Sequence, residues 1–365
     1  MTLCYYVTGH GFGHAIRTAQ VLKALPADMP IIVKTTVPER LFREELRGRE
    51  FRYIHAEYDC GCVQPDSVTI LKRESLDRYA AIAARNRTIL SAEASFLRDN
   101  AVSVVVTDIS PFPLEAAQLA GIPAIAATNF TWYDIYKPFV ETAADESMLA
   151  EIAAQYGMAT VALISGLHTP TTTLPFPVVE HVPLTARKGV RRRTELDTFL
   201  NGHPSPAIST SALHIGLLYM GTWGLDIDWD VVERIPGWRF VTYDALPRPL
   251  TNVTLLSRDQ WIYADVVASV DAVISKVGYG TVTDSIANSV PQVHLPRRDF
   301  VEYDALVAGM DLWGGRVEMS EAEFIAGQWD TALASALNVT MNPNAFRTDG
   351  AEVIARRIVE MAGRQ

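Results

Sequence analysis

Short runs of apolar and largely β-branched residues recur along this chain, and stretches with helical apolar spacing separate them. In the first half we predict strands at Leu3–Thr8, Ile31–Thr35, Phe51–Ala56, Val102–Thr107, Ala124–Ala127 and Thr160–Ile164, the last of its domain. The predicted helices between them are Ala15–Leu25, Pro38–Arg47, Leu76–Asn100, Leu114–Ala120 and Asp145–Tyr156. Strands that alternate with helices in this way form a parallel sheet covered on both faces.

The second half repeats the alternation. Predicted strands are His214–Met220, Arg239–Thr242, Val253–Leu255, Ala272–Ile274 and Gln292–Leu295; predicted helices are Val231–Ile235, one that begins in Gln260–Ala264, Val282–Asn288, Phe324–Leu337 and Gly350–Ala362. A chain of 365 residues exceeds one ordinary core. We therefore expect an α/β protein with two Rossmann-like domains, 1–170 and 206–345. A linker with a solvated basic run, 171–205, joins them, and a final helical segment is 346–365.

A glycine-bearing turn follows the predicted strand Ala272–Ile274 and precedes a helix. This layout points backbone N–H groups and the positive end of the helix at a phosphate group. The residues predicted to bind a nucleotide there are Ser275, Lys276, Gly278, Tyr279, Gly280, Thr281 and Asp284. The glycines admit a close ligand, the hydroxyls and Lys276 contact phosphate, and Asp284 accepts hydrogen bonds from ribose. The alternative is a tight turn without a ligand.

This turn resembles the nucleotide-sugar half of glycosyltransferases with two Rossmann-like domains, the GT-B architecture. It is similar to the lipid II N-acetylglucosaminyltransferase and to natural-product glycosyltransferases. Their S-x-x-G-x-x-T-x-x-E pattern is matched by Ser275, Gly278, Thr281 and Asp284, with Asp in place of Glu. The resemblance also implies that Glu302–Tyr303 stands where those enzymes have an acidic–Gln pair that contacts the donor sugar. It implies that Ser257 lies near the nucleotide base of the donor. It further implies that the last helix packs on the first domain.

The first strand leads into Gly9-His10-Gly11-Phe12-Gly13-His14, where the strict G-x-G-x-x-G fingerprint is absent. Gly11 and Gly13 are predicted to line the ligand site. A histidine at the start of the helix is a usable general base near neutral pH. His14 is the predicted base and His10 the reserve candidate; the alternative is that both histidines only cap and pack the turn.

Asp108 ends the strand Val102–Thr107, on the edge of the sheet where ligands bind. If that strand lies beside the first one, Asp108 can orient His14 by accepting its ring N–H. The alternative is that Asp108 caps the turn at Pro111. Farther along, Thr128–Tyr136 reads as a loop with four aromatic residues, which either line a cleft or pack under the loop.

Four N-terminal motifs, GHGFGHAIR, DCGCVQPDS, the Val102–Pro111 segment and TNFTWYDIY, resemble a narrower family. They are similar to the glycosyltransferase-like region of plant L-arabinokinases and to stand-alone bacterial relatives. We expect no arabinokinase-type kinase domain in this chain.

The net charge, the apolar runs and the cysteine count limit the expected binding partners and compartment. The formal net charge of −10 and a pI near 5.3 disfavour nucleic acid or an anionic membrane as the main partner. No apolar run reaches the length of a membrane span, and the first residues lack the features of a signal peptide. Cys4, Cys60 and Cys62 are too few for a disulfide framework, so a reducing, cytoplasmic compartment is expected.

No metal is expected. The acids Asp226, Asp228 and Asp230 imitate a DxD motif but lead directly into a helix, so capping explains them. The neighbouring turn, with Thr222, is a candidate phosphate-side or acceptor-side loop.

Together these features predict a hexosyl- or pentosyltransferase that uses a UDP-sugar-like donor and a small-molecule acceptor and needs no cofactor. Retaining enzymes of the GT-B architecture commonly carry two glutamates eight residues apart, and the matching positions here are Lys276 and Asp284. Inversion is therefore expected. The alternatives are a nucleotide-sugar 2-epimerase and a non-catalytic nucleotide-sugar-binding protein.

Overall fold

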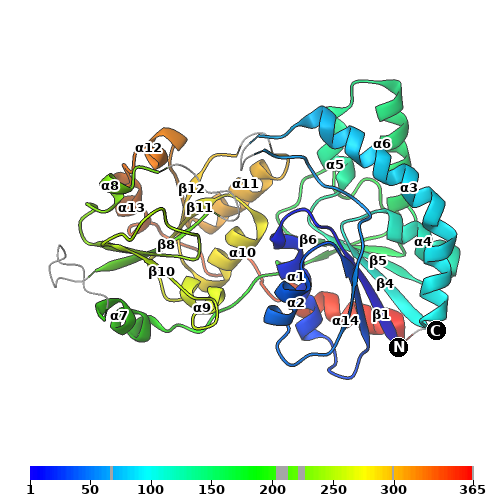
Figure 1. Cartoon of the computed structure of the whole chain (residues 1–365), viewed down its shortest axis with the longest axis horizontal. Coiled ribbons are helices and arrows are strands. Elements are labelled where there is room, and N and C mark those ends of the chain that lie inside the picture. Colours follow the sequence, from blue (N-terminus) through cyan, green and yellow to red (C-terminus); the bar gives the residue numbers. More distant parts are fainter. Residues whose placement is uncertain (66–68, 203–212, 221–226, 298–299, 364–365) are drawn as a thin grey trace. The chain divides into compact units, whose positions relative to one another are not determined.

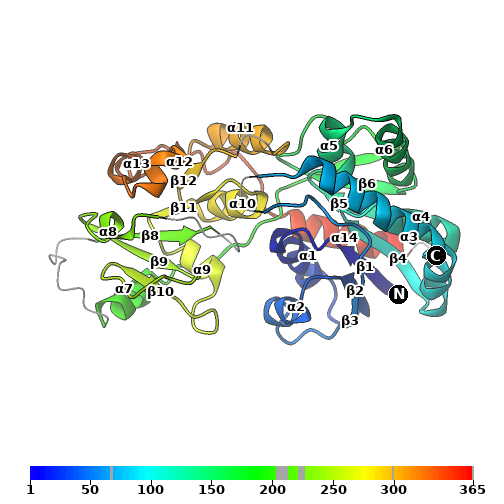
Figure 2. The same ribbon diagram turned by 45° about the horizontal axis from the view of Figure 1, so that its top comes forward.

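The computed structural model describes residues 1–65, 69–202, 213–220, 227–297 and 300–363. The chain divides into two compact units (Figures 1 and 2). Unit 1 comprises Met1–Ala186, Asp299–Glu302 and Arg347–Gln365, and unit 2 comprises Arg187–Arg298 and Tyr303–Phe346. The predicted two α/β domains are thus present, and the chain passes from unit 1 to unit 2 inside the segment predicted as a linker.

Unit 1 is built on a seven-stranded parallel sheet in the order β3-β2-β1-β4-β5-β6-β7. Its strands are β1 Thr2–Val7, β2 Ile31–Thr35, β3 Arg52–His55, β4 Val102–Asp108, β5 Ala124–Thr128, β6 Val161–Ser165 and β7 Val179–Val182. The strand order reverses direction at β1 and β4, which pair with each other and bring Val7 opposite Asp108. Ligands of open α/β sheets bind at such a switch point, outside the carboxyl ends of the strands.

Helices cover both faces of this sheet (Figure 1). One face carries α1 Phe12–Ala24, α2 Glu39–Glu45 and α14 Gly350–Ala362, whose apolar residues share a core with alternate residues of the strands. The other carries α3 Lys72–Asp99, α4 Phe112–Ala120, α5 Trp132–Tyr136, the short 3-10 turn Lys137–Phe139 and α6 Ala143–Tyr156. The last helix, α14, therefore packs in the first unit.

Unit 2 holds a six-stranded parallel sheet in the order β10-β9-β8-β11-β12-β13. Its strands are β8 His214–Tyr219, β9 Trp238–Thr242, β10 Val253–Leu255, β11 Ala272–Lys276, β12 Gln292–Leu295 and β13 Arg316–Glu318. Its helices are α7 Arg193–Asn201, α8 Trp229–Val232, α9 Tyr263–Val267, α10 Tyr279–Asn288, α11 Tyr303–Trp313, α12 Glu321–Ile325 and α13 Asp330–Ala336. Here β8 and β11 flank the switch point, so the turn after β11 lies at the ligand-binding edge.

Several sequence predictions need correction, and the helices α7 and α11 were not predicted. β7 and β13 were missed, because both are short edge strands with mixed burial that give no continuous apolar run. The predicted helix Phe324–Leu337 is two helices, since Gly327 adopts a left-handed conformation with φ of 69° between them. The predicted loop Thr128–Tyr136 contains α5, which begins with a capping box between Thr131 and Asp134.

The basic run is not merely a solvated face. Arg187 is half-buried and pairs with Asp284, and Arg193 pairs with Asp271 at 2.7 Å. Both contacts tie the first residues of unit 2 to its sheet and helices.

Candidate functional site

His14 lies in the first turn of α1, directly after β1, and its side chain is 9% exposed. Its Nδ1 lies 3.0 Å from Oδ1 of Asp108, which ends the neighbouring strand β4 and is fully buried. The predicted contact between His14 and Asp108 is therefore present, and the same carboxylate also bonds Arg17. α4 begins at Phe112, and its N-cap residue, Pro111, makes no side-chain capping hydrogen bond.

Arg17, one helical turn after His14, was missed by the sequence reasoning. Its Nε donates to Oδ2 of Asp108 at 3.0 Å. Burial alone would raise the pKa of Asp108, but the charges of Arg17 and His14 and their hydrogen bonds outweigh it, so this pKa lies below its usual range. Asp108 is therefore a carboxylate at neutral pH, which can accept a hydrogen bond from Nδ1 of His14 in the tautomer that carries its proton there. Nη2 of Arg17 also lies 3.2 Å from this Nδ1.

Asn129 extends this arrangement. It follows β5, accepts a hydrogen bond from Nη1 of Arg17, and donates from Nδ2 to Oε2 of Glu302 at 3.0 Å. Glu302 is buried and belongs to unit 1, so this predicted donor-sugar residue lies in the network of His14. Tyr303 begins α11 in unit 2 and is 7% exposed. The signals that could have revealed Arg17 and Asn129 are the i, i+3 spacing from His14 and the polar residue just after a strand.

Glycine is present for different structural reasons at the positions in and beside the turn between β1 and α1. Gly11 has φ of 73° and precedes α1, so its backbone requires glycine. At Gly13 a Cβ would meet nothing within 4 Å, so this exposed position is open to a ligand. A Cβ at Gly61 would lie 2.3 Å from the ring of His10, which meets Trp132 edge-on at 5.5 Å. His10 is thus packed by the Cys60–Cys62 loop, as the structural alternative expected for it.

Most of the four aromatic residues of Thr128–Tyr136 pack in the core. Phe130, Trp132 and Tyr136 are at most 3% exposed and belong to the core under β4 and β5. Only Tyr133 of the four is partly exposed.

In unit 2 the turn after β11 leaves open space. A Cβ at Gly278 or at Gly280 would meet nothing within 4 Å, and Gly278 has an ordinary extended φ of −156°. Neither the backbone conformation nor packing against the residues that the structure describes therefore requires glycine at these two positions. Glycine there is what a ligand approaching the start of α10 would require.

Two residues predicted to bind the donor, Ser275 and Asp284, are buried and make hydrogen bonds within unit 2. Ser275 is 1% exposed; its Oγ accepts from Nε2 of Gln292 at 2.7 Å and donates to the carbonyl of Lys276. Asp284 is 2% exposed, and its carboxylate accepts from the backbone N–H of Arg187 at 2.7 Å and from its Nε at 2.9 Å.

Two other predicted residues do reach the surface of this turn, Thr281 and Lys276. Thr281 is partly exposed in the first turn of α10, whereas Tyr279 beside it is buried, with 8% of its surface exposed. Lys276 is partly exposed at the end of β11; burial, with the positive charge of Arg297 beside it, lowers its pKa to about 8. Arg297, after β12, is a second cation at this edge that the sequence reasoning missed.

The remaining candidates lie apart from this turn. Ser257 is exposed after β10 and accepts a hydrogen bond from the N–H of Asp259 at 3.3 Å. Asp228 caps α8, and Asp230 pairs with Arg248. Thr222 and Asp226 lie outside the described residues. Among the residues that the structure describes, no three His, Cys, Asp or Glu side chains are grouped to hold a metal, and no helix is long and apolar enough to cross a membrane.

Comparison with solved structures identifies the fold. The chain matches the calicheamicin glycosyltransferase CalG4 with a TM-score of 0.58 and 18% identity, over 99% of this chain and 95% of that one. It matches Phytolacca americana UGT2, complexed with UDP-2fluoro-glucose and pterostilbene, with a TM-score of 0.60 and 15% identity, over 100% and 95%. It matches MurG of Acinetobacter baumannii with a TM-score of 0.55 and 14% identity, over 98% of this chain and 99% of that one. The chain therefore has the two-domain fold of the GT-B glycosyltransferases.

Comparison of amino-acid sequences finds one similar protein. The chain is 30% identical over 348 residues to the L-arabinokinase of Arabidopsis thaliana. The match covers 93% of this chain but 32% of the plant protein, so the chain spans about a third of that relative's length. No family model matches the chain.

Proposed function

We propose that this protein is a glycosyltransferase that moves a sugar from a nucleoside-diphosphate sugar to a small-molecule acceptor. The observation that carries the proposal is the His14–Asp108 pair, 3.0 Å apart at the switch point of unit 1. The open glycine turn of unit 2 supports it, as does the similarity to glycosyltransferases, one of them bound to a UDP-sugar analogue and a small phenolic compound.

The base acts on the acceptor. Nε2 of His14 takes the proton of an acceptor hydroxyl while that oxygen forms a bond to the anomeric carbon of the donor. The bond from the anomeric carbon to the diphosphate oxygen breaks, and its electron pair leaves with the diphosphate. Asp108 stabilises the imidazolium that forms, and Arg17 holds Asp108 in its charged state. A single displacement of this kind inverts the anomeric configuration.

The donor diphosphate is assigned to the start of α10. Backbone N–H groups beside Gly278 and Gly280, the hydroxyl of Thr281 and the ammonium of Lys276 supply positive potential for the leaving group. Because these groups can neutralise the leaving charge, we propose a transfer that needs no metal.

The function is tested with purified protein, a panel of UDP- and other nucleotide-sugars, and an acceptor library. A new glycoside whose anomeric configuration, read by NMR, is opposite to that of the donor supports the proposal. An epimerase would instead change the sugar stereochemistry without an acceptor, and a binding protein would show no turnover. Activity that is lost with EDTA and restored by a metal would contradict the metal-independent reaction.

Gly280→Ala is expected to stabilise the fold and at the same time to weaken the binding of UDP. Gly280 lies within α10, so alanine should raise the unfolding free energy by up to about 1 kcal/mol. The added methyl group occupies the space assigned to the diphosphate, so affinity for UDP should fall roughly tenfold or more, measured by calorimetry. Gly202→Ala, at the end of α7, is the control, which should leave UDP affinity unchanged. Undiminished UDP binding by Gly280→Ala would place the diphosphate elsewhere.

Donor affinity is expected to fall as the pH rises through about 8, where Lys276 loses its proton. Below that pH the ammonium attracts the diphosphate, and above it the neutral amine does not. The change can approach but not exceed about tenfold per pH unit. Lys276→Arg should give an affinity that is nearly flat over the same range, because arginine stays charged. Identical UDP-binding pH profiles for the two proteins would exclude Lys276 as a phosphate ligand.

A further inference from the structure

The ring nitrogen Nδ1 of His14 has two competing partners. Oδ1 of Asp108 lies 3.0 Å from it, and Nη2 of Arg17 lies 3.2 Å from it. A neutral imidazole carries one proton, so Nδ1 either donates to the carboxylate or accepts from the guanidinium. In the first case Nε2 can take the proton of an acceptor hydroxyl, and in the second case Nε2 carries the ring proton itself. The position of Arg17 therefore decides whether His14 can act as a base.

Asn129 holds the guanidinium of Arg17 from another side. Nε and Nη2 of Arg17 donate to the two oxygens of Asp108, Nε at 3.0 Å, and Nη1 donates to Oδ1 of Asn129. Arginine has donors only, so the oxygen of the Asn129 amide has to face Arg17. These contacts fix the plane of the guanidinium along the carboxylate of Asp108.

Glu302 fixes the orientation of the Asn129 amide. Its Oε2 accepts from Nδ2 of Asn129 at 3.0 Å, and the two residues are 5% and 0% exposed. If the amide were reversed, its Nδ2 would face Nη1 of Arg17, donor against donor. The direction of each hydrogen bond from Glu302 to Arg17 is therefore determined, and both side chains between Glu302 and Asp108 are buried.

The segment that carries Glu302 also supports the ring of His14 by packing. Phe300 and Glu302 belong to unit 1, although the chain on both sides of this segment belongs to unit 2. The ring of Phe300 meets that of Phe130 edge-on, with centroids 6.2 Å apart, and Phe130 meets His14 edge-on at 5.3 Å. One short segment thus contacts the surroundings of His14 through an apolar and a polar route.

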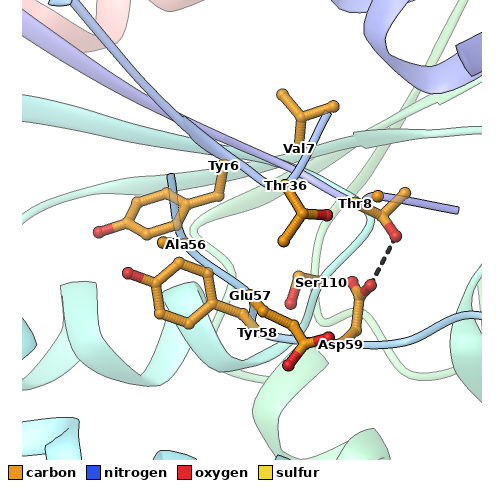
Figure 3. Close-up of a pocket in the computed structure, with 10 residues that line it drawn as sticks. Tyr6, Val7, Thr8, Thr36, Ala56, Glu57, Tyr58, Asp59 and Ser110 are labelled. Atoms are coloured by element: carbon orange, nitrogen blue, oxygen red, sulfur yellow. Dashed lines mark hydrogen bonds between the residues drawn. The ribbon is translucent and has the colours of Figure 1, made fainter. Parts of the chain in front are cut away.

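A second buried carboxyl group near His14 has partners of its own. Asp59 is 5% exposed, and burial raises its pKa, although the charge of His14 is one of the influences that oppose this rise. Its Oδ1 accepts from the hydroxyl of Thr8 at 2.5 Å (Figure 3), and its Oδ2 accepts from Nε1 of Trp132 at 3.0 Å. Among the residues that the structure describes, the polar contacts of Nδ1 of His14 are therefore its two competing partners.

We propose that Asn129 and Glu302 are positioning residues that select the tautomer of His14. They hold Arg17 on Asp108, so that Nδ1 of His14 keeps the ring proton and donates to Asp108, and Nε2 is left without a proton. This inference rests on the proposed function, because only a general base requires an unprotonated Nε2. It gives Glu302 a role toward the base in place of the donor-sugar contact that the resemblance implies.

The test uses the full chain labelled with ¹⁵N-histidine, because the NMR shifts of the ring nitrogens distinguish the two neutral tautomers. Spectra are recorded at about pH 8.5, above the ordinary pKa of histidine, and the signals of His14 are those missing in His14→Ala. The wild type should show an excess of the Nδ1–H tautomer. Asn129→Ala and Glu302→Ala should each shift the tautomer ratio roughly five- to tenfold toward Nε2–H, the effect of one lost hydrogen bond.

Two control variants separate this role from a loss of stability. Glu302→Gln should keep the wild-type tautomer ratio, because its amide oxygen can still accept from Asn129. Asp145→Ala removes a carboxylate of unit 1 that is 4% exposed and lies 2.9 Å from Nη1 of Arg73, so it should lower the unfolding temperature. It should leave the His14 signals unchanged.

Turnover should fall with the tautomer ratio in Asn129→Ala and Glu302→Ala, whereas the affinity for UDP-glucose, measured by calorimetry, should stay at the wild-type value. An excess of Nε2–H in the wild type would overturn the inference. So would a Glu302→Ala protein that loses UDP-glucose affinity at an unchanged tautomer ratio, which would make Glu302 a donor ligand.

Failure of this inference is distinct from failure of the proposed function, because the ring signals are measured without substrate. A tautomer ratio that follows Asn129 and Glu302 in a protein that transfers no sugar would uphold the selection of the tautomer and refute the transferase. Sugar transfer by a protein whose tautomer ratio is the same in all these variants would do the reverse.

Discussion

His14→Ala is expected to lower kcat by roughly 100- to 10,000-fold, the usual contribution of a positioned general base. The ring is held by Asp108 at 3.0 Å, and a methyl group cannot take the acceptor proton. Affinity for UDP should stay at the wild-type value, because the residues assigned to the diphosphate belong to unit 2. The measurements are steady-state turnover and UDP binding by calorimetry on the same preparations.

His10→Ala is the matched comparison for this substitution, since it removes the second histidine of the same turn. It should retain most of the turnover, because the His10 ring packs against Gly61 and Trp132. Wild-type turnover in His14→Ala, or a large loss in His10→Ala alone, would end the assignment of the base.

Asp108→Asn would change two contacts at once. Asp108 also carries the charge that compensates the buried Arg17, so the amide weakens a buried ion pair as well as the hold on His14. Turnover of this variant therefore needs to be read together with its thermal unfolding.

Asp284→Ala is expected to lower the free energy of unfolding by roughly 3–5 kcal/mol, the usual effect of removing one partner of a buried ion pair. The side chains of Asp284 and Arg187 are 3% and 13% exposed, so Arg187 would be left largely buried without its carboxylate. The backbone N–H of Arg187 would also lose its acceptor. Urea unfolding followed by tryptophan fluorescence measures the change.

The double variant Arg187→Met, Asp284→Ala should recover part of that stability, because no unpaired charge remains and the methionine can still pack on the ring of Tyr263, which the guanidinium now covers at 4.3 Å. A ribose-binding Asp284 predicts the opposite pattern. Asp284→Ala would then keep its stability and lose roughly 1–3 kcal/mol of UDP affinity.

The hydrophobic pattern by itself determined the α/β class and most of the elements of both units. Buried parallel strands such as β4, with every residue inside, have to be continuous apolar runs, and that signal is local. It failed at β7 and β13, because an edge strand with mixed burial lacks the signal. The pairing of His14 with Asp108 was also foreseeable, because Asp108 ends β4 and His14 follows β1, and the carboxyl ends of these two strands meet at one edge of a parallel sheet.

Only the tertiary structure decided which polar groups are already satisfied within the chain. The sequence presents Ser275 and Asp284 as equivalent to Thr281 and Lys276, but Gln292 and Arg187 occupy the first two. Conversely, among the described residues nothing lies within 4 Å of a Cβ placed at Gly278 or Gly280. Hydrogen bonds between residues far apart in the chain depend on how sheets and helices pack, and a local pattern carries no record of that packing.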